Sequence, residues 1–244
     1  MKKIFEGAIS CKAILENKER KCFCLYMDKN KKTKDFSYIE RLAKQRKCPI
    51  KKVEREKINT LCTSKGHGGI CLEASLKEKN SLNCLRPQGY IAYIDGVEDP
   101  YNLGSVIRTL YASGCNALIL PDRDWSFAES TILKASAGTY EKLSIYWSKS
   151  DEEFISLLNK NKIPLILAHR KFSISLDSYT FPNNFCLAIG GALRGISSKL
   201  QKAAQQNVHI EYGRDFRNAL DTPSAVAVFS FFIAHQRKDK GYEN

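Results

Sequence analysis

The sequence lacks any long run of apolar residues. No segment of the 244-residue chain approaches the ~20 consecutive apolar residues that a membrane-spanning helix needs. Two lysines near its start precede a segment too short and too polar for a signal peptide. We therefore expect a cytoplasmic protein. Its nine cysteines are scattered and odd in number, which in that compartment favours free thiols over disulfide bonds.

Acidic residues are scarce too, but only in the first third of the chain. Residues 1–86 contain 22 Lys and Arg against 10 Asp and Glu, a net charge of +12. Residues 87–244 contain 17 against 16. A positive field concentrated in this way favours a polyanion such as nucleic acid, because each neutralised phosphate releases counterions. A Lys-rich surface that serves solubility alone is the alternative, and charge by itself leaves both open.

The stretch at residues 77–89, KEKNSLNCLRPQG, is polar and aperiodic and predicts a linker. Before it, apolar runs alternate with helical patterns, which predicts a small α/β domain at residues 1–76. The expected strands are Cys22–Met27, Ile50–Val53 and Gly69–Glu73, and the expected helices are Tyr38–Lys47 and Glu54–Cys62.

A more regular alternation follows at residues 90–244. The expected strands are Tyr90–Ile94, Ala117–Leu120, Leu143–Tyr146, Leu165–Ala168, Phe185–Ile189 and Val208–Ile210. The expected helices are Leu103–Ser113, Glu129–Ala137, Glu152–Lys160 and Ser197–Gln205. Continuously apolar strands separated by helices indicate a parallel sheet covered on both faces. Since ligands of such sheets bind at the carboxyl ends of strands, we expect the site in the loops after Ile94, Ile189 and Ile210.

The segment at residues 94–114, IDGVEDPYNLGSVIRTLYASG, predicts a strand end, a tight turn and a helix that stops at Gly114. Asn102 and Arg108 are six positions apart, about 240° around a regular helix, so they share no face. We therefore expect Asn102 to act from the loop or as the helix N-cap, and Arg108 from the helix. Taken singly, the two residues are better explained as a cap and a surface salt bridge.

Taken together, the segment resembles the first motif of the SpoU (TrmH-like) RNA 2′-O-ribose methyltransferases of the SPOUT class, D-G-V-x-D-P-x-N-L-G-x-x-x-R. The match is long and contiguous, and therefore specific. The resemblance implies that Asn102 and Arg108 approach the target ribose and its phosphate. The matching positions are Asp95, Gly96, Val97, Asp99, Pro100, Asn102, Leu103, Gly104 and Arg108.

Two weaker matches follow in the family's order. LAIGGALRGISSKL, at residues 187–200, fits the second motif at Gly190, Gly195 and Ile196, but Ala192 stands where the family has glutamate. IEYGRDFRNALDTPSAVAVFSFFIAHQ, at residues 210–236, resembles the third motif, with Asp221 at the family's asparagine. Its matching positions are Ile210, Leu220 and Ala225, whereas Ala219 and Pro223 replace two serines.

The resemblance implies a SPOUT fold, in which the C-terminal segment of a parallel-sheet domain forms a deep trefoil knot. It implies that Gly190, Gly195, Ile210 and Leu220 bind S-adenosylmethionine, largely through backbone groups. It also implies a homodimer and an RNA substrate, ribosomal rather than transfer RNA. The segments GAISCKAIL at 7–15 and HGGICL at 67–72 resemble the L30-like substrate-binding domain of many members.

Methyl transfer to a ribose hydroxyl needs two reactants held in line and help for a hydroxyl that hardly ionises at neutral pH. The guanidinium of Arg108 suits a phosphate or a developing alkoxide but is a poor base, so the base stays open. Ala192 offers no carboxylate. Asp221 is an acceptor-only anion that could orient the hydroxyl, act as the base, or repel a phosphate. The catalytic candidates are thus Asn102, Arg108 and Asp221.

A relative that binds RNA without methyl transfer is therefore the alternative function. A large gain in rate from near zero on Ala192→Glu would favour that alternative. A nicotinamide-dependent dehydrogenase is disfavoured, because no G-x-G-x-x-G follows a strand near the start of a βαβ unit.

The remaining candidate residues are better explained by packing than by chemistry. Cys22, Cys24, Cys62 and His67 lack a second pair at ligand spacing, so we expect thiols rather than a metal site. We assign structural roles to His169, His209 and His235. An apolar helix with Phe229, Phe231 and Phe232 predicts core or dimer interface. Packing is also the commoner role for Tyr101 and Trp125, although either could stack on a base.

Overall fold

A computed structural model describes residues 2–191 and 195–239 of the chain. They form two compact units. The first combines Met1–Glu78 with Trp125–Lys142, and the second combines Lys79–Asp124 with Leu143–Asn244. Each unit is described below by itself.

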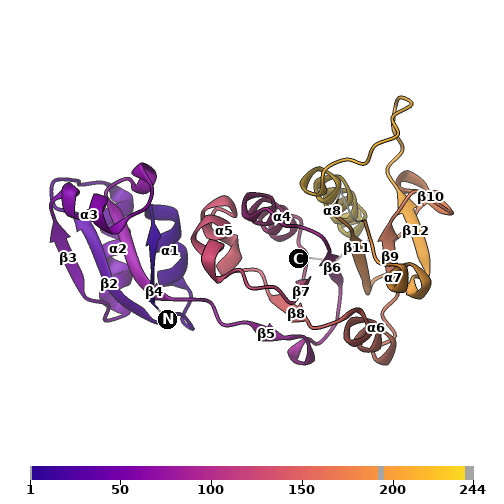
Figure 1. Cartoon of the computed structure of the whole chain (residues 1–244), viewed down its shortest axis with the longest axis horizontal. Helices are drawn as coiled ribbons and strands as arrows, with labels where there is room; N and C mark the ends of the chain where they lie inside the picture. The colour runs from indigo at the N-terminus through magenta and orange to yellow at the C-terminus, as the bar shows by residue number, and fades with distance from the viewer. Residues whose placement is uncertain (1, 192–194, 240–244) are drawn as a thin grey trace. The chain divides into compact units, whose positions relative to one another are not determined.

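The first unit contains a four-stranded sheet in the order β1-β4-β2-β3 (Figure 1). β4 pairs antiparallel with both β1 and β2, and β2 pairs parallel with β3. Helices α1 and α2 pack together, and a helical segment from residues 125–142, containing α5, packs on α1. The strands are Lys2–Glu6 (β1), Cys22–Asp28 (β2), Ile50–Val53 (β3) and Ile70–Ser75 (β4), and the helices are Ala8–Glu16 (α1), Lys34–Gln45 (α2), Arg55–Leu61 (α3) and Glu129–Ala135 (α5).

The second unit is built on an eight-stranded sheet in the order β10-β12-β9-β11-β6-β7-β8-β5, and every described pairing in it is parallel. This confirms the α/β class and the parallel sheet. The strands are Asn80–Ser81 (β5), Tyr90–Ile94 (β6), Ala117–Pro121 (β7), Ile145–Ser148 (β8), Leu165–Ala168 (β9), Ser173–Ser175 (β10), Phe185–Ile189 (β11) and Gln206–His209 (β12).

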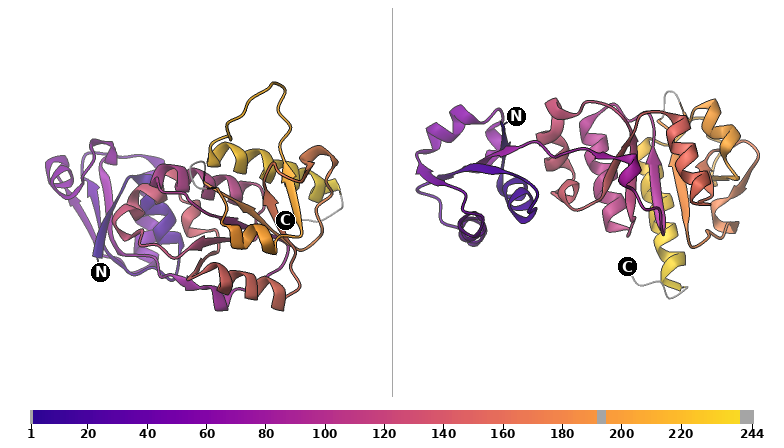
Figure 2. Two further views of the ribbon diagram at one scale, coloured as in Figure 1. Left: turned by 45° about the vertical axis from the view of Figure 1, so that its right-hand side comes forward. Right: turned by 90° about the horizontal axis from the view of Figure 1, so that it is seen from below.

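Helices cover both faces of this sheet (Figures 1 and 2). Side chains alternate along β6: Ile91 and Tyr93 join a core with Phe154 of α6 and Leu200 of α7, whereas the Tyr90 hydroxyl meets that of Ser230 on α8. Helix α4 packs against α8. The helices are Pro100–Ala112 (α4), Asp151–Lys160 (α6), Ser198–Ala203 (α7) and Thr222–Asp239 (α8).

Two local expectations need correction. Asn102 is not the N-cap of α4. The cap is Asp99, whose side chain accepts the backbone N–H of Asn102 (2.8 Å), and Pro100 occupies the first helical position, where no N–H donor is needed. The stretch predicted as a linker is structured from residue 80, because β5 pairs with β8 and Leu82 and Leu85 are buried in the second unit's core.

The nine cysteines are free, as expected. The described residues bring together no group of three or more His, Cys, Asp or Glu side chains that could hold a metal ion. Within the same part of the chain, no helix combines the length and the apolar character that crossing a bilayer requires.

A buried ionic cluster ties residues 125–142 to the rest of the first unit. The Arg20 Nη1 atom lies 2.6 Å from Glu129 Oε1 and 2.9 Å from Glu141 Oε1, and all three side chains are at most 4% exposed. Asn17 donates to Glu141, and the backbone N–H of Lys77 donates to Glu129. Burial raises the pKa of Glu129 despite the attraction of Arg20. Arg20 is therefore the one cation that bonds both buried carboxylates directly, and the ammonium of Lys77 is a second positive charge near them.

Replacing Arg20 by methionine should destabilise the protein by about 3–5 kcal/mol, because two carboxylates are left buried without their cation. Urea unfolding followed by circular dichroism measures the loss. Burial already raises the pKa of Glu129, and without the attraction of Arg20 its folded-state pKa rises further above the unfolded value. The deficit should therefore be smallest near the unfolded glutamate pKa of about 4.3 and grow as the pH rises.

The triple variant Arg20→Met, Glu129→Gln, Glu141→Gln removes all three charges and should recover most of the stability. Lys44→Met, at an exposed lysine of α2, is the control. A loss for Arg20→Met no larger than that for Lys44→Met would show that the cluster is not a stabilising element.

Candidate active site

Loops that follow β6 and β11 meet at the carboxyl ends of these neighbouring strands. β6 and β11 pair in register over their whole length, from Tyr90 with Phe185 to Ile94 with Ile189. The backbone N–H of Asp95 donates to the carbonyl of Ile189 (3.0 Å). A Cβ atom on Gly191 would lie 2.5 Å from the carbonyl oxygen of Gly96, a distance that side chains do not tolerate. Glycine at 191 therefore lets the two loops lie backbone against backbone.

The start of α8 joins the same region. The Thr222 hydroxyl lies 3.4 Å from the carbonyl oxygen of Gly190, and Thr222 is buried. On Gly190 a Cβ atom would lie 2.5 Å from the carbonyl carbon of Gly195, so this turn also requires glycine. The three sequence motifs, far apart along the chain, are thus adjacent in space.

A cavity of about 310 Å³ opens beside these loops, entirely within the second unit. All four residues predicted to bind the cofactor, Gly190, Gly195, Ile210 and Leu220, line it. Its other walls come from the loop after β9, the end of β12 and the start of α8. These walls include Ala168, His169, Arg170, Lys171, Ile189, Gly191, Ile196, Val208, His209, Tyr212, Arg217, Ala219, Ala225 and Phe229.

The wall after β9 was missed by sequence reasoning. His169 and His209, assigned structural roles above, both line the cavity, as do Arg170 and Lys171. The loop after β9 lies at the cavity because β9 is placed between β11 and β12 in the sheet. That order is not readable from one sequence, although a basic His-Arg-Lys triplet directly after an apolar strand was the available signal.

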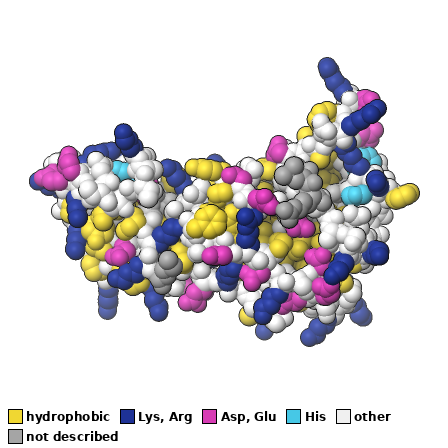
Figure 3. Space-filling model, viewed as in Figure 1, with side chains coloured by type: hydrophobic (Ala, Val, Ile, Leu, Met, Phe, Trp, Pro, Cys, Tyr) yellow, Lys and Arg dark blue, Asp and Glu magenta, His cyan; other side chains and the backbone are white. Residues whose placement is uncertain are grey.

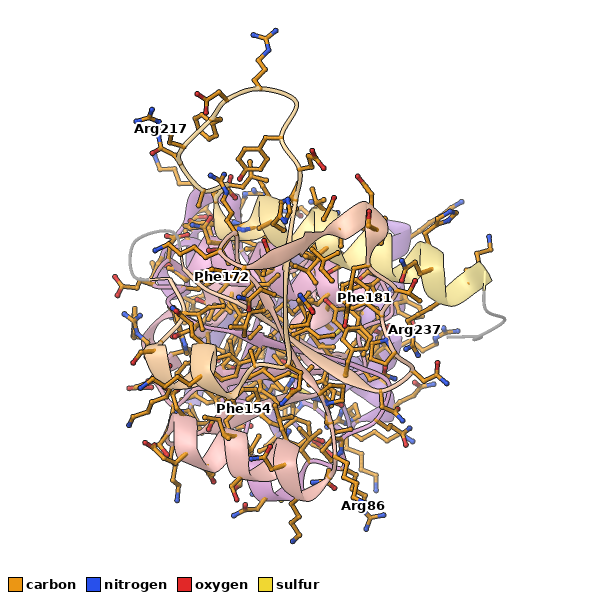
Figure 4. The ribbon with its side chains drawn as sticks, turned by 90° about the vertical axis from the view of Figure 1, so that its right-hand side faces the viewer. Arg86, Phe154, Phe172, Phe181, Arg217 and Arg237 are labelled. Carbon is orange, nitrogen blue, oxygen red and sulfur yellow. The ribbon has the colours of Figure 1, made fainter. Side chains whose placement is uncertain are left out.

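Arg170 holds the segment between β12 and α8, at whose exposed turn Arg217 lies (Figure 4). Its guanidinium donates to the carbonyls of Phe216, Arg217 and Asn218 at 3.1, 3.0 and 2.6 Å. The same group lies over the ring of Tyr212, 4.2 Å from its centroid. The Tyr212 hydroxyl in turn accepts the backbone N–H of Leu220 (3.1 Å). Arg170 therefore orders the segment that supplies one wall of the cavity.

Asn102 and Arg108 both lie on α4, and neither lines the cavity. Asn102 is in the first turn, close to the Gly96 loop along the chain, and Arg108 lies about 9 Å further along the helix axis. Leu103, Val106 and Ile107 face the core, so both polar side chains are exposed. Among the described residues, Arg108 has no ion-pair or hydrogen-bond partner. Its charge is therefore available to an anion.

Asp221 immediately precedes α8 and caps it. Its carboxylate accepts the backbone N–H of Ser224 (2.9 Å) and the Ser224 hydroxyl (2.7 Å). These hydrogen bonds hold the pKa of Asp221 below its ordinary value. A carboxylate stabilised in this way is a weak base. Ala192, at the family's glutamate position, lies outside the described residues.

Comparisons with known proteins give the same family that the three sequence motifs resemble. The model of the SpoU rRNA Methylase family matches residues 89–231, and the model described as RNA 2′-O ribose methyltransferase substrate binding matches residues 4–79. The chain is 29% identical to the mitochondrial rRNA methyltransferase 1 of Schizosaccharomyces pombe over 61% of this chain and 59% of that protein. It is 24% identical to the 23S rRNA (guanosine-2′-O-)-methyltransferase of Xanthomonas campestris over 82% of each. With some bacterial relatives the match covers only about half of the relative's length.

The AdoMet-bound rRNA methyltransferase of Sinorhizobium meliloti has the same fold. It superposes with a TM-score of 0.80, at 19% identity, over 98% of this chain and 87% of that one. The contiguous motif at residues 94–108, the meeting of the three motif loops and the family match over residues 89–231 agree. This chain belongs to the SpoU rRNA methylase family.

Proposed function

We propose that this protein transfers a methyl group from S-adenosylmethionine to a ribose 2′-OH of RNA. The observation that carries the proposal is the cavity at the carboxyl ends of β9, β11 and β12. It gathers the four predicted cofactor residues from two separate motifs and lies beside the loop that leads to Asn102. Structures of relatives that bear AdoMet, from Sinorhizobium meliloti and Streptomyces viridochromogenes, support the choice of cofactor.

The residues present fit that cofactor. Apolar walls at Ile189, Ile210 and Leu220 suit a flat aromatic base, and the bare backbones of Gly190 and Gly191 allow close approach. The cavity's volume of about 310 Å³ lies at the lower end of the range of small-molecule sites. Bound there, S-adenosylmethionine would supply an activated methyl group on a sulfonium.

The chain's own residues would position the RNA. Arg108, exposed and unpaired among the described residues, grips a phosphate and stabilises charge that develops on the ribose oxygen. Asn102 offers both a donor and an acceptor to the ribose. Asp221, with its lowered pKa and two Ser224 hydrogen bonds, orients the start of α8 rather than accepting the proton. We leave the proton acceptor unassigned.

Ribosomal RNA is the proposed substrate in preference to transfer RNA. The Schizosaccharomyces pombe and Xanthomonas campestris relatives are both rRNA methyltransferases. In this proposal an L30-like domain at residues 1–76 contacts the RNA, and residues 90–244, apart from the 125–142 segment that packs in the first unit, form the methyltransferase domain. Residues 77–89 lead from one to the other and add β5 to the parallel sheet. The match of a substrate-binding model to residues 4–79 supports the first assignment. Nine free cysteines suit a reducing compartment such as the cytoplasm.

We further propose a homodimer with a knotted C-terminal segment. Helix α8 contacts α4 and β11, and the hydroxyl of its first residue, Thr222, reaches the carbonyl of Gly190, so the C-terminal segment lies against the loop after β11. Four large apolar side chains on α4 and α8 remain exposed: Tyr101, Tyr111, Val228 and Phe231. Exposed apolar side chains gathered on two adjoining helices are typical of an interface.

Wild-type protein should incorporate label from methyl-labelled cofactor into total RNA, and Arg108→Ala should lower the rate about a hundredfold or more. Because Arg108 lies outside the cavity, its loss should leave cofactor affinity unchanged. Arg86→Ala, an exposed arginine on the opposite side of the unit from Arg217 in Figure 4, is the control. If the wild type binds cofactor but incorporates no label, the protein is an RNA-binding relative without activity.

Arg170→Gln should raise the cofactor dissociation constant roughly tenfold, because hydrogen bonds from a charged donor to the 216–218 carbonyls are lost. The segment then has to be ordered by the ligand itself. Isothermal titration measures the constant, with Arg86→Gln as control. An affinity within twofold of wild type would mean that the segment is ordered without Arg170.

Phe231→Glu should convert a dimer into a monomer, since it places a charge among the apolar side chains of α4 and α8. Analytical ultracentrifugation measures the mass in solution. Phe172→Glu is the matched control, because Phe172 is 97% exposed and lies elsewhere on the unit. A wild-type monomer, or a dimer that survives Phe231→Glu, would contradict this interface.

A further inference from the structure

A second cleft lies in the first unit and has no part in the site described above. It encloses about 470 Å³ and is lined by one face of α3 and the loop that follows. Its lining residues are Arg55, Asn59, Cys62, Thr63, Ser64, Lys65 and His67. Apart from Cys62 and the buried His67, these are polar side chains at or near the surface, so the cleft is open to a polar ligand.

The floor of the cleft is held rigidly. His67 is 1% exposed, and its Nδ1 atom accepts the backbone N–H of Gly69 (3.1 Å). An acceptor Nδ1 means that the neutral ring carries its proton on Nε2, which donates to Asn59 Oδ1 (2.8 Å). With its oxygen engaged, the exposed amide of Asn59 presents its NH₂ group as a fixed donor.

Glu6 fixes the wall opposite. Its carboxylate accepts hydrogen bonds from the backbone and hydroxyl groups of both Thr63 and Ser64. Although partial burial opposes the effect, these bonds hold the pKa of Glu6 below its ordinary value. The loop is thus ordered before any ligand arrives, and the carboxylate of Glu6 already accepts four hydrogen bonds from it.

Cations surround the opening. Arg55 and Lys65 line it, and Lys134 Nζ lies 3.3 Å from where a Cβ atom of Gly66 would stand. Lys31 Nζ donates to the carbonyl of Gly68 (2.7 Å). The opposing carboxylates are Glu6 and the buried Asp28, which lies 3.5 Å from Arg55. Lys and Arg side chains along the upper edge of this unit are visible in Figure 3. The balance at the cleft is positive.

We propose that this cleft binds one unpaired nucleotide of the RNA substrate. Arg55 and Lys65 would contact its phosphates, and the Asn59 amide would donate to an acceptor on the base edge. A cleft that combines cations with an oriented neutral donor fits a nucleotide splayed out of a loop. A regular duplex keeps its bases stacked and paired, so it offers no splayed-out nucleotide to the cleft. The inference rests on the proposed function, because it takes the ligand to be RNA.

The test measures binding of full-length protein to a fluorescein-labelled, ten-nucleotide single-stranded RNA of mixed sequence, by anisotropy. Arg55→Gln with Lys65→Gln should weaken binding about tenfold or more and lower the salt dependence by roughly 1.4, at about 0.7 per phosphate contact. Lys44→Gln with Lys52→Gln removes the same charge from two lysines paired with Glu40, outside the cleft, and should have a much smaller effect. Equal losses in the two double variants would overturn the proposal.

Asn59→Asp tests the donor without disturbing the fold, since it keeps the oxygen that pairs with His67 and replaces the NH₂ group. It should weaken RNA binding, whereas unchanged affinity would overturn the proposed contact between Asn59 and the base edge. The same oligomer annealed to its complement should bind more weakly. Equal affinity for the duplex would rule out recognition of an unpaired nucleotide.

Methyl transfer separates this inference from the proposed function. If the cleft variants bind cofactor normally but show a raised KM for RNA, both stand. If the wild type methylates no RNA, yet the cleft variants bind the oligomer more weakly than the wild type, the cleft proposal stands and the enzymatic proposal falls. If methylation and RNA affinity are unaltered in the cleft variants, the cleft proposal falls alone.

Discussion

The site depends on the close approach of two loops whose glycines permit backbone contact. β6 and β11 end level because they pair in register, so the chain leaves both strands at the same edge. Gly191 and Gly96 then lie too close for a side chain at 191. With the loops fixed in this way, Asp99 caps α4 a few residues later and Asn102 is placed in its first turn. The close approach of Gly191 and Gly96 thus links the cofactor cavity to Asn102, which does not line it.

Much of the framework was predictable because its signals are local. The limits of β6, β9 and β11 follow from short apolar runs bounded by polar, glycine or proline residues. The motif residues predicted for the cofactor do share one cavity. The N-cap of α4 is Asp99 rather than the predicted Asn102, because an Asp-Pro pair is the stronger start signal: Asp accepts a backbone N–H and Pro suits the first helical position. Strand β1 and the short β5 were not predicted, since each is specified by its pairing partner rather than by its own pattern.

Other features were out of reach because they depend on distant partners. Glu129 and Glu141 look like ordinary helix-surface acids in the sequence, but both are buried against Arg20, more than a hundred residues earlier. The helix predicted at Glu129–Ala137 exists as α5. In the sequence it lies between two strands of the parallel sheet, β7 and β8, yet it packs in the first unit. The periodicity of that segment does not indicate whether it packs in the first unit or on the parallel sheet.

The arginines show how partners decide role. Arg20 neutralises two buried carboxylates, and Arg46 donates to four backbone carbonyls in the first unit. Arg170 satisfies three carbonyls and covers a tyrosine ring. A guanidinium whose donors are already engaged gains little from a phosphate, because old hydrogen bonds must break first. Arg108, which has no such partner among the described residues, loses nothing when an anion arrives. By residue type alone each of these arginines could contact RNA. Their surroundings separate those that stabilise the protein from Arg108, which is left for the substrate.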